Sequence, residues 1–131
     1  MQTNMGEQIM KELADLVLTD HFLDNYKPSW LNGLEMDRYY PSLRCAFEFQ
    51  GDQHLHYTFS LYDSHSAFLT QIQNDEKKKK ILAKKNIHLI EITTDDLTPS
   101  LFYSKLASLT FSDEVPVIPS SLHTRIQRYQ S

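Results

Sequence analysis

The chain has 131 residues, of which 40% are hydrophobic and 23% charged, with a formal net charge of −4 at pH 7. This composition fits one globular domain, and the negative charge argues against a broad, non-specific nucleic-acid surface. One cysteine, Cys45, excludes an intrachain disulfide and a cysteine-based zinc site. No apolar run approaches the roughly 20 residues that span a bilayer, and the amphipathic, partly acidic N-terminus is unlike a signal or transit peptide. We therefore expect a cytoplasmic protein, neither secreted nor membrane-bound.

The hydrophobic pattern predicts a helix near the N-terminus, where apolar residues recur at spacings of three and four from Ile9 onward. Two strands are predicted next, over residues 34–40 and 43–50. The turn at Pro41-Ser42 between them is short, so we expect the strands to pair in antiparallel fashion. Alternation in the second strand predicts one apolar face, made of Leu43, Cys45, Phe47 and Phe49.

Downstream, residues 52–66 are polar, carry three histidines and are predicted to form a loop. A long helix is predicted over about 67–85, with a buried stripe of Phe68, Ile72, Ile81 and Leu82. Residues 87–92 are apolar on both faces, which is typical of an interior strand. A further helix is expected over 95–108, and residues 115–131 are expected to pack weakly. This order predicts an α/β or α+β fold, a small mixed β-sheet flanked by helices.

Two acidic residues, Asp37 and Glu48, would meet at the edge of the sheet if the two strands pair. Neighbouring carboxylates repel each other unless a positive charge lies between them. Magnesium suits such a position, because it prefers oxygen ligands and keeps several waters. A bound cation would contact a phosphate oxygen, acidify a water and stabilise the leaving oxygen. The alternative is that both acids are solvated residues on the surface of the strands.

Residues 34–43, LEMDRYYPSL, and 46–54, AFEFQGDQH, resemble the PD-(D/E)XK nuclease superfamily. The similarity is greatest to small endonucleases related to very-short-patch repair enzymes and to phage homing endonucleases. In that group an acid-x-Asp strand leads through a Pro-x-Leu turn into an apolar strand. That strand ends in acid-x-Gln/Asn-Gly, and a histidine follows a few residues later.

The resemblance extends over about residues 6–96. Gly6-Glu7 is similar to the Gly-Glu that begins the first helix of this group, and residues 86–92 are similar to its Gly-Ile-x-Leu-Ile-x-Ile strand. Asp75 and Lys78 match an Asp-x-x-Lys in the preceding helix. The resemblance implies a restriction-endonuclease-like core, within a single nuclease-like domain over residues 1–110. Residues 111–131 would then form a C-terminal extension.

The resemblance also implies roles for individual residues. Asp37 corresponds to the principal metal ligand and Glu48 to the second acid of the motif, with Mg²⁺ as the cofactor and Mn²⁺ as a substitute. Gln50 stands where many members have lysine, so water activation would pass to His54, whose unperturbed pKa is near neutrality. Glu7 corresponds to the acid of the first helix that completes the site. Further candidates for the site are Asp75, Lys78 and Glu35.

Two other groups of side chains leave alternatives open. His54 and His56, with an acid, have a spacing compatible with zinc, although histidines in a polar loop are commonly just exposed. The basic cluster that begins at Lys77 is the best candidate for phosphate contacts, but such a run is commonly a solvated helix face. The candidate nucleic-acid contacts are Lys77, Lys79, Lys80 and Lys84.

Together these features predict a magnesium-dependent endonuclease that hydrolyses phosphodiester bonds, with DNA as the expected substrate. The alternative is a catalytically inactive nuclease-like domain that binds nucleic acid or another protein. A small-molecule metal hydrolase is disfavoured, because the sequence contains no glycine-rich phosphate loop. A homodimer or a partner protein could supply specificity.

Overall fold

The fold contains four strands and four α-helices within the part of the chain that is described. The computed structural model describes residues 4–50, 62–107, 109 and 116–131, with the backbone alone for residues 62–65 and 68. The elements are α1 (Met5–Asp15), β1 (Leu23–Tyr26), η1 (Ser29–Leu31), β2 (Met36–Tyr40), η2 (Pro41–Leu43), β3 (Cys45–Phe49), α2 (Tyr62–Lys84), β4 (His88–Ile92), η3 (Thr94–Leu97), α3 (Pro99–Lys105) and α4 (Ser120–Gln130), where η denotes a 3₁₀ helix. Among these helices, none is both long and apolar enough to cross a membrane.

The sheet is mixed, as the sequence predicts. Its strand order is β1-β2-β3-β4. The pairs β1-β2 and β2-β3 are antiparallel, whereas β3 and β4 run parallel. The antiparallel β2-β3 pair follows from the short η2 connection, and the parallel pair requires the long crossover that contains α2. The expectation of an α+β fold with a small mixed sheet flanked by helices is therefore confirmed.

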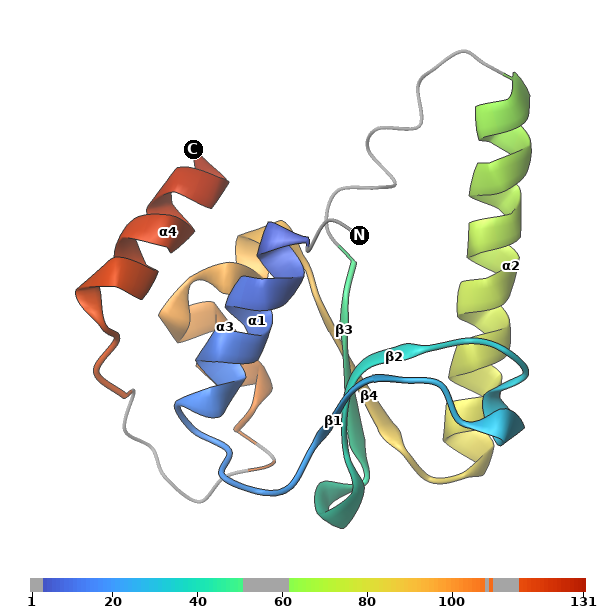
Figure 1. The fold of residues 1–131 in the computed structure, drawn as a ribbon, viewed down its shortest axis with the longest axis horizontal. Coiled ribbons are helices and arrows are strands. Elements are labelled where there is room, and N and C mark those ends of the chain that lie inside the picture. Colours follow the sequence, from blue (N-terminus) through green and yellow to red (C-terminus); the bar gives the residue numbers. More distant parts are fainter. Residues whose placement is uncertain (1–3, 51–61, 108, 110–115) are drawn as a thin grey trace.

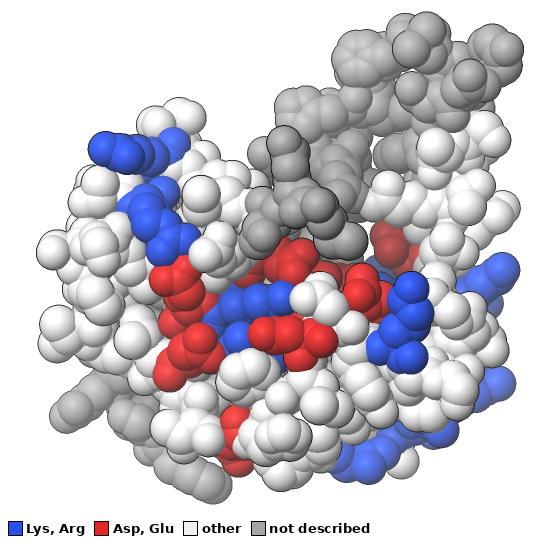
Figure 2. Space-filling model, in the orientation of Figure 1, with Lys and Arg blue, Asp and Glu red and all other residues white. Residues whose placement is uncertain are grey.

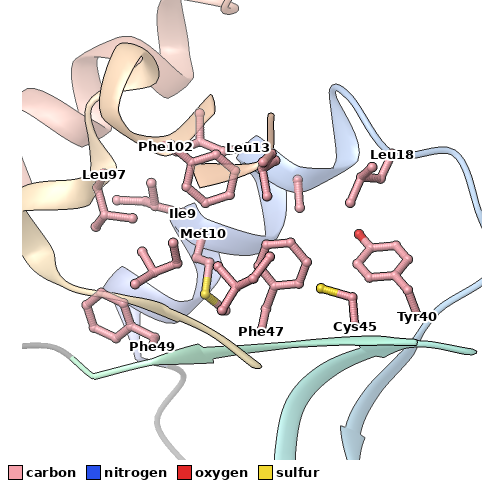
Figure 3. Close-up of a cluster of buried hydrophobic side chains, with 14 of the residues drawn as sticks. Ile9, Met10, Leu13, Leu18, Tyr40, Cys45, Phe47, Phe49, Leu97 and Phe102 are labelled. Atoms are coloured by element: carbon pink, nitrogen blue, oxygen red, sulfur yellow. The ribbon is translucent and has the colours of Figure 1, made fainter. Parts of the chain in front are cut away.

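One face of the sheet is covered by α1, α3 and α4, and the other by α2 (Figure 1). The first face holds the larger core, in which the strand side chains of Cys45, Phe47 and Phe49 pack toward α1 and Phe102 of α3 (Figure 3). These are three of the four residues of the apolar face predicted for the second strand; the fourth, Leu43, ends η2 and is partly buried against the same core. Burial of large apolar side chains of this kind, at roughly 1.5–3 kcal/mol each, is the main contribution to the stability of such a layer.

The second, smaller core lies under α2. Leu82 of α2 is 1% exposed and packs with Ala46 of β3 and Tyr39 of β2. The predicted buried stripe of this helix is wrong at Ile72, which is 37% exposed. Among the side chains of α2 that are described, those buried against the sheet lie in the C-terminal half, and they include a lysine, Lys78.

A buried arginine joins α1, β1 and β2. The Arg38 side chain is 3% exposed; its Nε lies 2.6 Å from Asp24 Oδ1 and its Nη1 2.6 Å from Asp15 Oδ1. Its guanidinium also lies 3.7 Å from the centre of the Phe22 ring. Figure 2 shows the molecule from the side drawn in Figure 1. Acidic and basic side chains are interleaved over the middle of the view, and further basic side chains lie at the margin formed by α2.

Four expectations about elements differ from the structure. The loop predicted over residues 52–66 is wrong from residue 62 onward, because α2 begins at Tyr62. The strand β1 (Leu23–Tyr26) was not predicted, because it has only four residues and Asn25 within it takes a left-handed conformation (φ 50°). The weak packing expected near the C-terminus is wrong for α4, whose Leu122 and Ile126 are buried in the larger core. Among the described strands β4 lies at an edge of the sheet, and its two faces are apolar because side chains of both cores pack on them.

Candidate active site

The β2 and β3 strands separate at Asp37 and Glu48. The ladder pairs Arg38 with Phe47, and the same register places Asp37 opposite Glu48. At this position the carboxylates replace the ladder hydrogen bonds. The Asp37 N–H donates to Glu48 Oε2 (3.1 Å), and the Phe49 N–H donates to Asp37 Oδ2 (2.7 Å). Each carboxylate therefore holds the opposite strand, and the two predicted acids lie side by side.

Lys78 brings a positive charge to this pair. It projects from α2, where its spacing of four from Leu82 places it on the side that faces the sheet. The residue is 8% exposed, and its Nζ donates to Glu48 Oε1. A lysine so deeply buried is rarely found without a partner. The ion pair with Glu48 is therefore part of how α2 is seated on the sheet.

The pKa values of Asp37 and Glu48 are both raised, so a nearby positive charge would stabilise their ionised forms. The pKa of Asp37 is raised from 3.8 to about 7, first by burial and then by the charges of Glu48 and Glu7, against the lowering effects of the Phe49 N–H and Lys78. The pKa of Glu48 is also raised, first by burial and then by the charge of Asp75, although Lys78 lowers it. Burial and like charges favour the protonated form, and a cation would favour the ionised form.

The structure thus brings together five residues that the sequence singles out: Glu7, Asp37, Glu48, Asp75 and Lys78. Glu7 lies in the first turn of α1, where its N–H donates to the capping side chain of Asn4 (3.1 Å). Its carboxylate pairs with Lys11 Nζ at 2.7 Å. Because that ion pair already engages it, Glu7 acts on Asp37 through its charge.

Gln50 has a different neighbour from the one its motif position suggests. Its Nε2 donates to Glu91 Oε2 (3.0 Å), and its N–H donates to the carbonyl of Ile92 (2.8 Å). Glu91 is in register with Glu48 across the parallel pair, and Lys79 Nζ lies 3.4 Å from its Oε1. The carboxylates of three neighbouring strands therefore form one row across the sheet: Asp37, Glu48 and Glu91.

The sequence reasoning did not place Glu91 among the site residues. The available signal was that Glu91 is the one acid in an otherwise largely apolar strand. Of the other candidates, Glu35 lies just before β2 begins, half-buried, and takes no part in the contacts that join Asp37, Glu48 and Lys78. The predictions for His54 and His56 concern positions outside the described residues.

The lysines of α2 divide between two flanks of the helix. Lys77 and Lys80 line a cavity of about 350 Å³ between α2 and the segment that contains Asn32 and Leu34. Lys79 is on the other flank, beside Glu91. Lys84, at the end of α2, is exposed.

The carboxylates of this site suit the magnesium that the resemblance implies in one mode of binding only. Within residues 4–50, 62–107, 109 and 116–131, no group of three or more His, Cys, Asp or Glu side chains is arranged to hold a metal ion. Magnesium, however, commonly takes only one or two carboxylates from a protein, together with waters and substrate phosphate oxygens. The pair of Asp37 and Glu48, with its raised pKa values, fits that mode of binding.

Comparison with known proteins gives one relative without a known role. The chain is 35% identical over 95 residues to "Uncharacterized protein 307L" of Invertebrate iridescent virus 6, an alignment that covers 69% of this chain. It covers 48% of the viral protein, so the chain spans about half the length of that relative. No protein-family model and no solved structure matches the chain.

Proposed function

We propose that this chain is a metal-dependent endonuclease that hydrolyses phosphodiester bonds, with DNA as its substrate, on a restriction-endonuclease-like core. The observation that carries the proposal is the pairing of Asp37 and Glu48. They lie on adjacent strands, each bonded to the backbone of the other's strand, with the buried Lys78 on Glu48. A small mixed sheet with helices on both faces is also the architecture that the sequence resemblance implies.

In this proposal Asp37 and Glu48 would hold Mg²⁺ or Mn²⁺. When bound, the cation would supply Lewis-acid chemistry, acidifying a water and stabilising charge on the phosphate and leaving oxygens. Asp37 would contribute an oxygen whose backbone hydrogen bond from Phe49 fixes its direction. Glu7 and Asp75 would add negative charge around the site and so strengthen its attraction for a cation.

Lys78 takes on the role that the motif gives to a lysine at position 50. Its ammonium group favours the ionised form of Glu48 and places positive charge where a phosphate in the site would develop negative charge. The amide of Gln50 is bound to Glu91 and holds β3 to β4. Abstraction of a proton by His54 remains part of the proposal.

A cleavage assay tests the proposal. Wild type would be incubated with supercoiled plasmid, linear duplex, single-stranded DNA and RNA, with Mg²⁺ or Mn²⁺ and with chelator. We expect metal-dependent cleavage of DNA and a loss of at least about 100-fold in Asp37→Asn, since removing a group that stabilises transition-state charge typically costs 10²–10³-fold. Asp95→Asn, a change at an exposed carboxylate of η3, is the matched control and should cleave normally. Equal cleavage by Asp37→Asn and wild type would exclude this site.

The alternative function, an inactive nuclease-like domain that binds nucleic acid or protein, is favoured by one observation. Lys78 already neutralises Glu48, which is how a site could be stabilised without a metal. Such a domain would bind DNA without any dependence on Mg²⁺ or Mn²⁺ and would cut none of the four substrates.

A further inference from the structure

A second feature of the molecule is a groove along the flank of α2 that faces the segment Trp30–Leu34. Two cavities form it, one against Asn32 and Leu34 and the other against Trp30. The cavity of about 350 Å³ is lined by Asn32, Leu34, Asn74, Lys77, Lys80 and Ile81. The other, of about 260 Å³, is lined by Trp30, Tyr39, Arg44, Lys85 and Ile87. We call these two cavities together the α2 groove.

The two cavities lie along one side of the helix. Asn74, Lys77 and Ile81 follow one another at spacings of three and four, which places them on one face. Lys85 continues this row by another four residues, and its N–H still donates to the carbonyl of Ile81 (3.2 Å). The row from 74 to 85 is about 16 Å long at 1.5 Å per residue. It begins beside Asp75 and Lys78, so one end of the groove lies next to the candidate active site.

Two of the charges along the α2 groove, those of Lys77 and Lys80, are available to a ligand. Within the described part of the chain, Lys77 and Lys80 have no ion-pair partner, whereas Lys79 on the opposite flank is paired with Glu91. Arg44 donates to the carbonyl of Lys85 at the end of α2. In a chain of net charge −4, this row of basic side chains along a hollow is suited to a string of phosphates.

The far end of the groove carries an aromatic ring. Trp30 is half-buried, and Lys85 Nζ lies 4.6 Å from the centre of its ring. Tyr39 lines the same cavity, and the ring of Tyr26 stacks on that of Tyr39 with an interplanar angle of 5°. An aromatic face beside a row of cations is the arrangement by which proteins bind single strands, because unpaired bases stack on the ring while the backbone follows the charges.

We propose that the α2 groove binds unpaired nucleotides of a DNA strand that continues into the candidate active site. The inference rests on the proposed nuclease function and narrows its substrate to DNA with a single-stranded segment next to the bond that is cut. Lys77 and Lys80 contact the phosphates nearest the site, and a base stacks on Trp30 at the far end. A duplex does not supply this contact, because its bases are stacked within the helix.

Binding is measured separately from cleavage, in chelator, with the anisotropy of a labelled oligothymidylate. Trp30 is the one tryptophan of the chain, so its intrinsic fluorescence reports directly on this end of the groove. We expect the oligothymidylate to quench Trp30 and to bind more tightly than a duplex of the same length. Trp30→Leu, which keeps an apolar side chain but removes the ring, should weaken binding by roughly tenfold or more.

Two matched double variants test the charges. Lys77→Gln with Lys80→Gln removes two positive charges from the groove, and Lys79→Gln with Lys105→Gln removes two that are paired with acids elsewhere. The first pair should weaken oligothymidylate binding by about tenfold and flatten its dependence on salt, and the second should change both little. Circular dichroism and thermal melting establish that each variant is folded.

The outcomes separate this inference from the proposed function. The proposal that the α2 groove binds unpaired nucleotides would be rejected if single strand and duplex bound equally. It would also be rejected if Trp30→Leu and the Lys77/Lys80 variant bound like wild type. Neither result would affect the nuclease proposal. The opposite result is also possible: oligothymidylate quenches Trp30 and binds more weakly to the variants, but no DNA is cleaved. That result would support binding in the α2 groove and reject the nuclease proposal.

Discussion

At the scale of single residues, the candidate site depends on an ion pair that is nearly closed to water. The side chains of Lys78 and Glu48 are 10% and 13% exposed. Pairs of this kind contribute little when both partners are present, because desolvation offsets their attraction, but removing one partner leaves a buried charge unpaired. Lys78 and Glu48 should therefore behave as one unit toward mutation.

Glu48→Ala should consequently destabilise the protein by about 3–5 kcal/mol, the usual cost of breaking a buried pair. The double variant Glu48→Ala/Lys78→Met should recover most of that loss, since it removes both charges and leaves an unbranched apolar chain in place of the lysine. Urea denaturation of the four proteins of this cycle measures the coupling. If the effects of the two single changes on the free energy of unfolding simply add in the double variant, the ion pair does not hold α2 to the sheet.

Asp37 makes stability depend on pH in the metal-free protein. Burial and the charge of Glu48 raise its pKa from 3.8 to about 7, so between these values the folded state holds a proton that the unfolded state has lost. Stability should therefore fall as the pH rises through that window. Asp37→Asn removes this titration and keeps an oxygen for the Phe49 N–H.

We expect Asp37→Asn to be more stable than wild type at about pH 8, on the order of 4 kcal/mol, and nearly equal to it at about pH 4, given about 1.4 kcal/mol for each of the roughly three pKa units. Urea denaturation in chelator at several pH values measures this difference. An identical dependence on pH in both proteins would mean that the carboxyl of Asp37 is not buried as described.

Whether a contact in the candidate site could be predicted from the sequence depended on how far apart its two residues lie along the chain. Asp37 and Glu48 could be paired from the sequence, because a short turn fixes two adjacent antiparallel strands. The contact between Lys78 and Glu48 could not, because it depends on how the crossover helix α2 sits on the sheet. The same limit applies to Gln50 and Glu91, which are 41 residues apart.

At the scale of elements, α1 is seated against β3 and α4 through a glycine. A Cβ on Gly6 would overlap the ring of Phe49 and would lie 2.8 Å from the hydroxyl of Tyr129. Any larger residue must therefore push α1 away from the core at the turn that carries Glu7.

Gly6→Ala should destabilise the protein by about 1–3 kcal/mol, the usual cost of overpacking, even though alanine is the better helix former. Gln8→Ala, at an exposed position of the same helix, is the matched control and should have little effect. Thermal melting compares the two variants. A stability gain in Gly6→Ala would show that α1 does not approach β3 this closely.

Elements with strong periodicity could be predicted, and those defined by tertiary contacts could not. Alternation in β3 and the apolar faces of β4 follow from the sequence and match the two cores. The short β1 is held by the pair of Asp24 with Arg38, which local patterning does not reveal. In α2, Ile72 is exposed, and the described side chains that are buried against the sheet lie in the C-terminal half of the helix.

At the scale of the whole molecule, a row of carboxylates lies beside a row of lysines in a chain of net charge −4. The carboxylates Asp37, Glu48 and Glu91 form one row across the sheet, while Lys77, Lys80 and Lys85 follow the α2 groove. In the proposed function, the first row would attract a cation and the second would attract phosphates. The arrangement is what a metal-dependent nuclease requires, and an inactive binding domain would need only the second part of it.

Titration with Mn²⁺, followed by calorimetry or electron paramagnetic resonance, tests the central claim most directly. We predict that wild type binds Mn²⁺, and that affinity rises as the pH increases through 7, because the cation competes with the proton on Asp37. Asp37→Asn should lose this binding, and Asp95→Asn should retain it. Failure of the wild type to bind Mn²⁺ with or without DNA, or equal binding by Asp37→Asn, would contradict a metal site at Asp37 and Glu48.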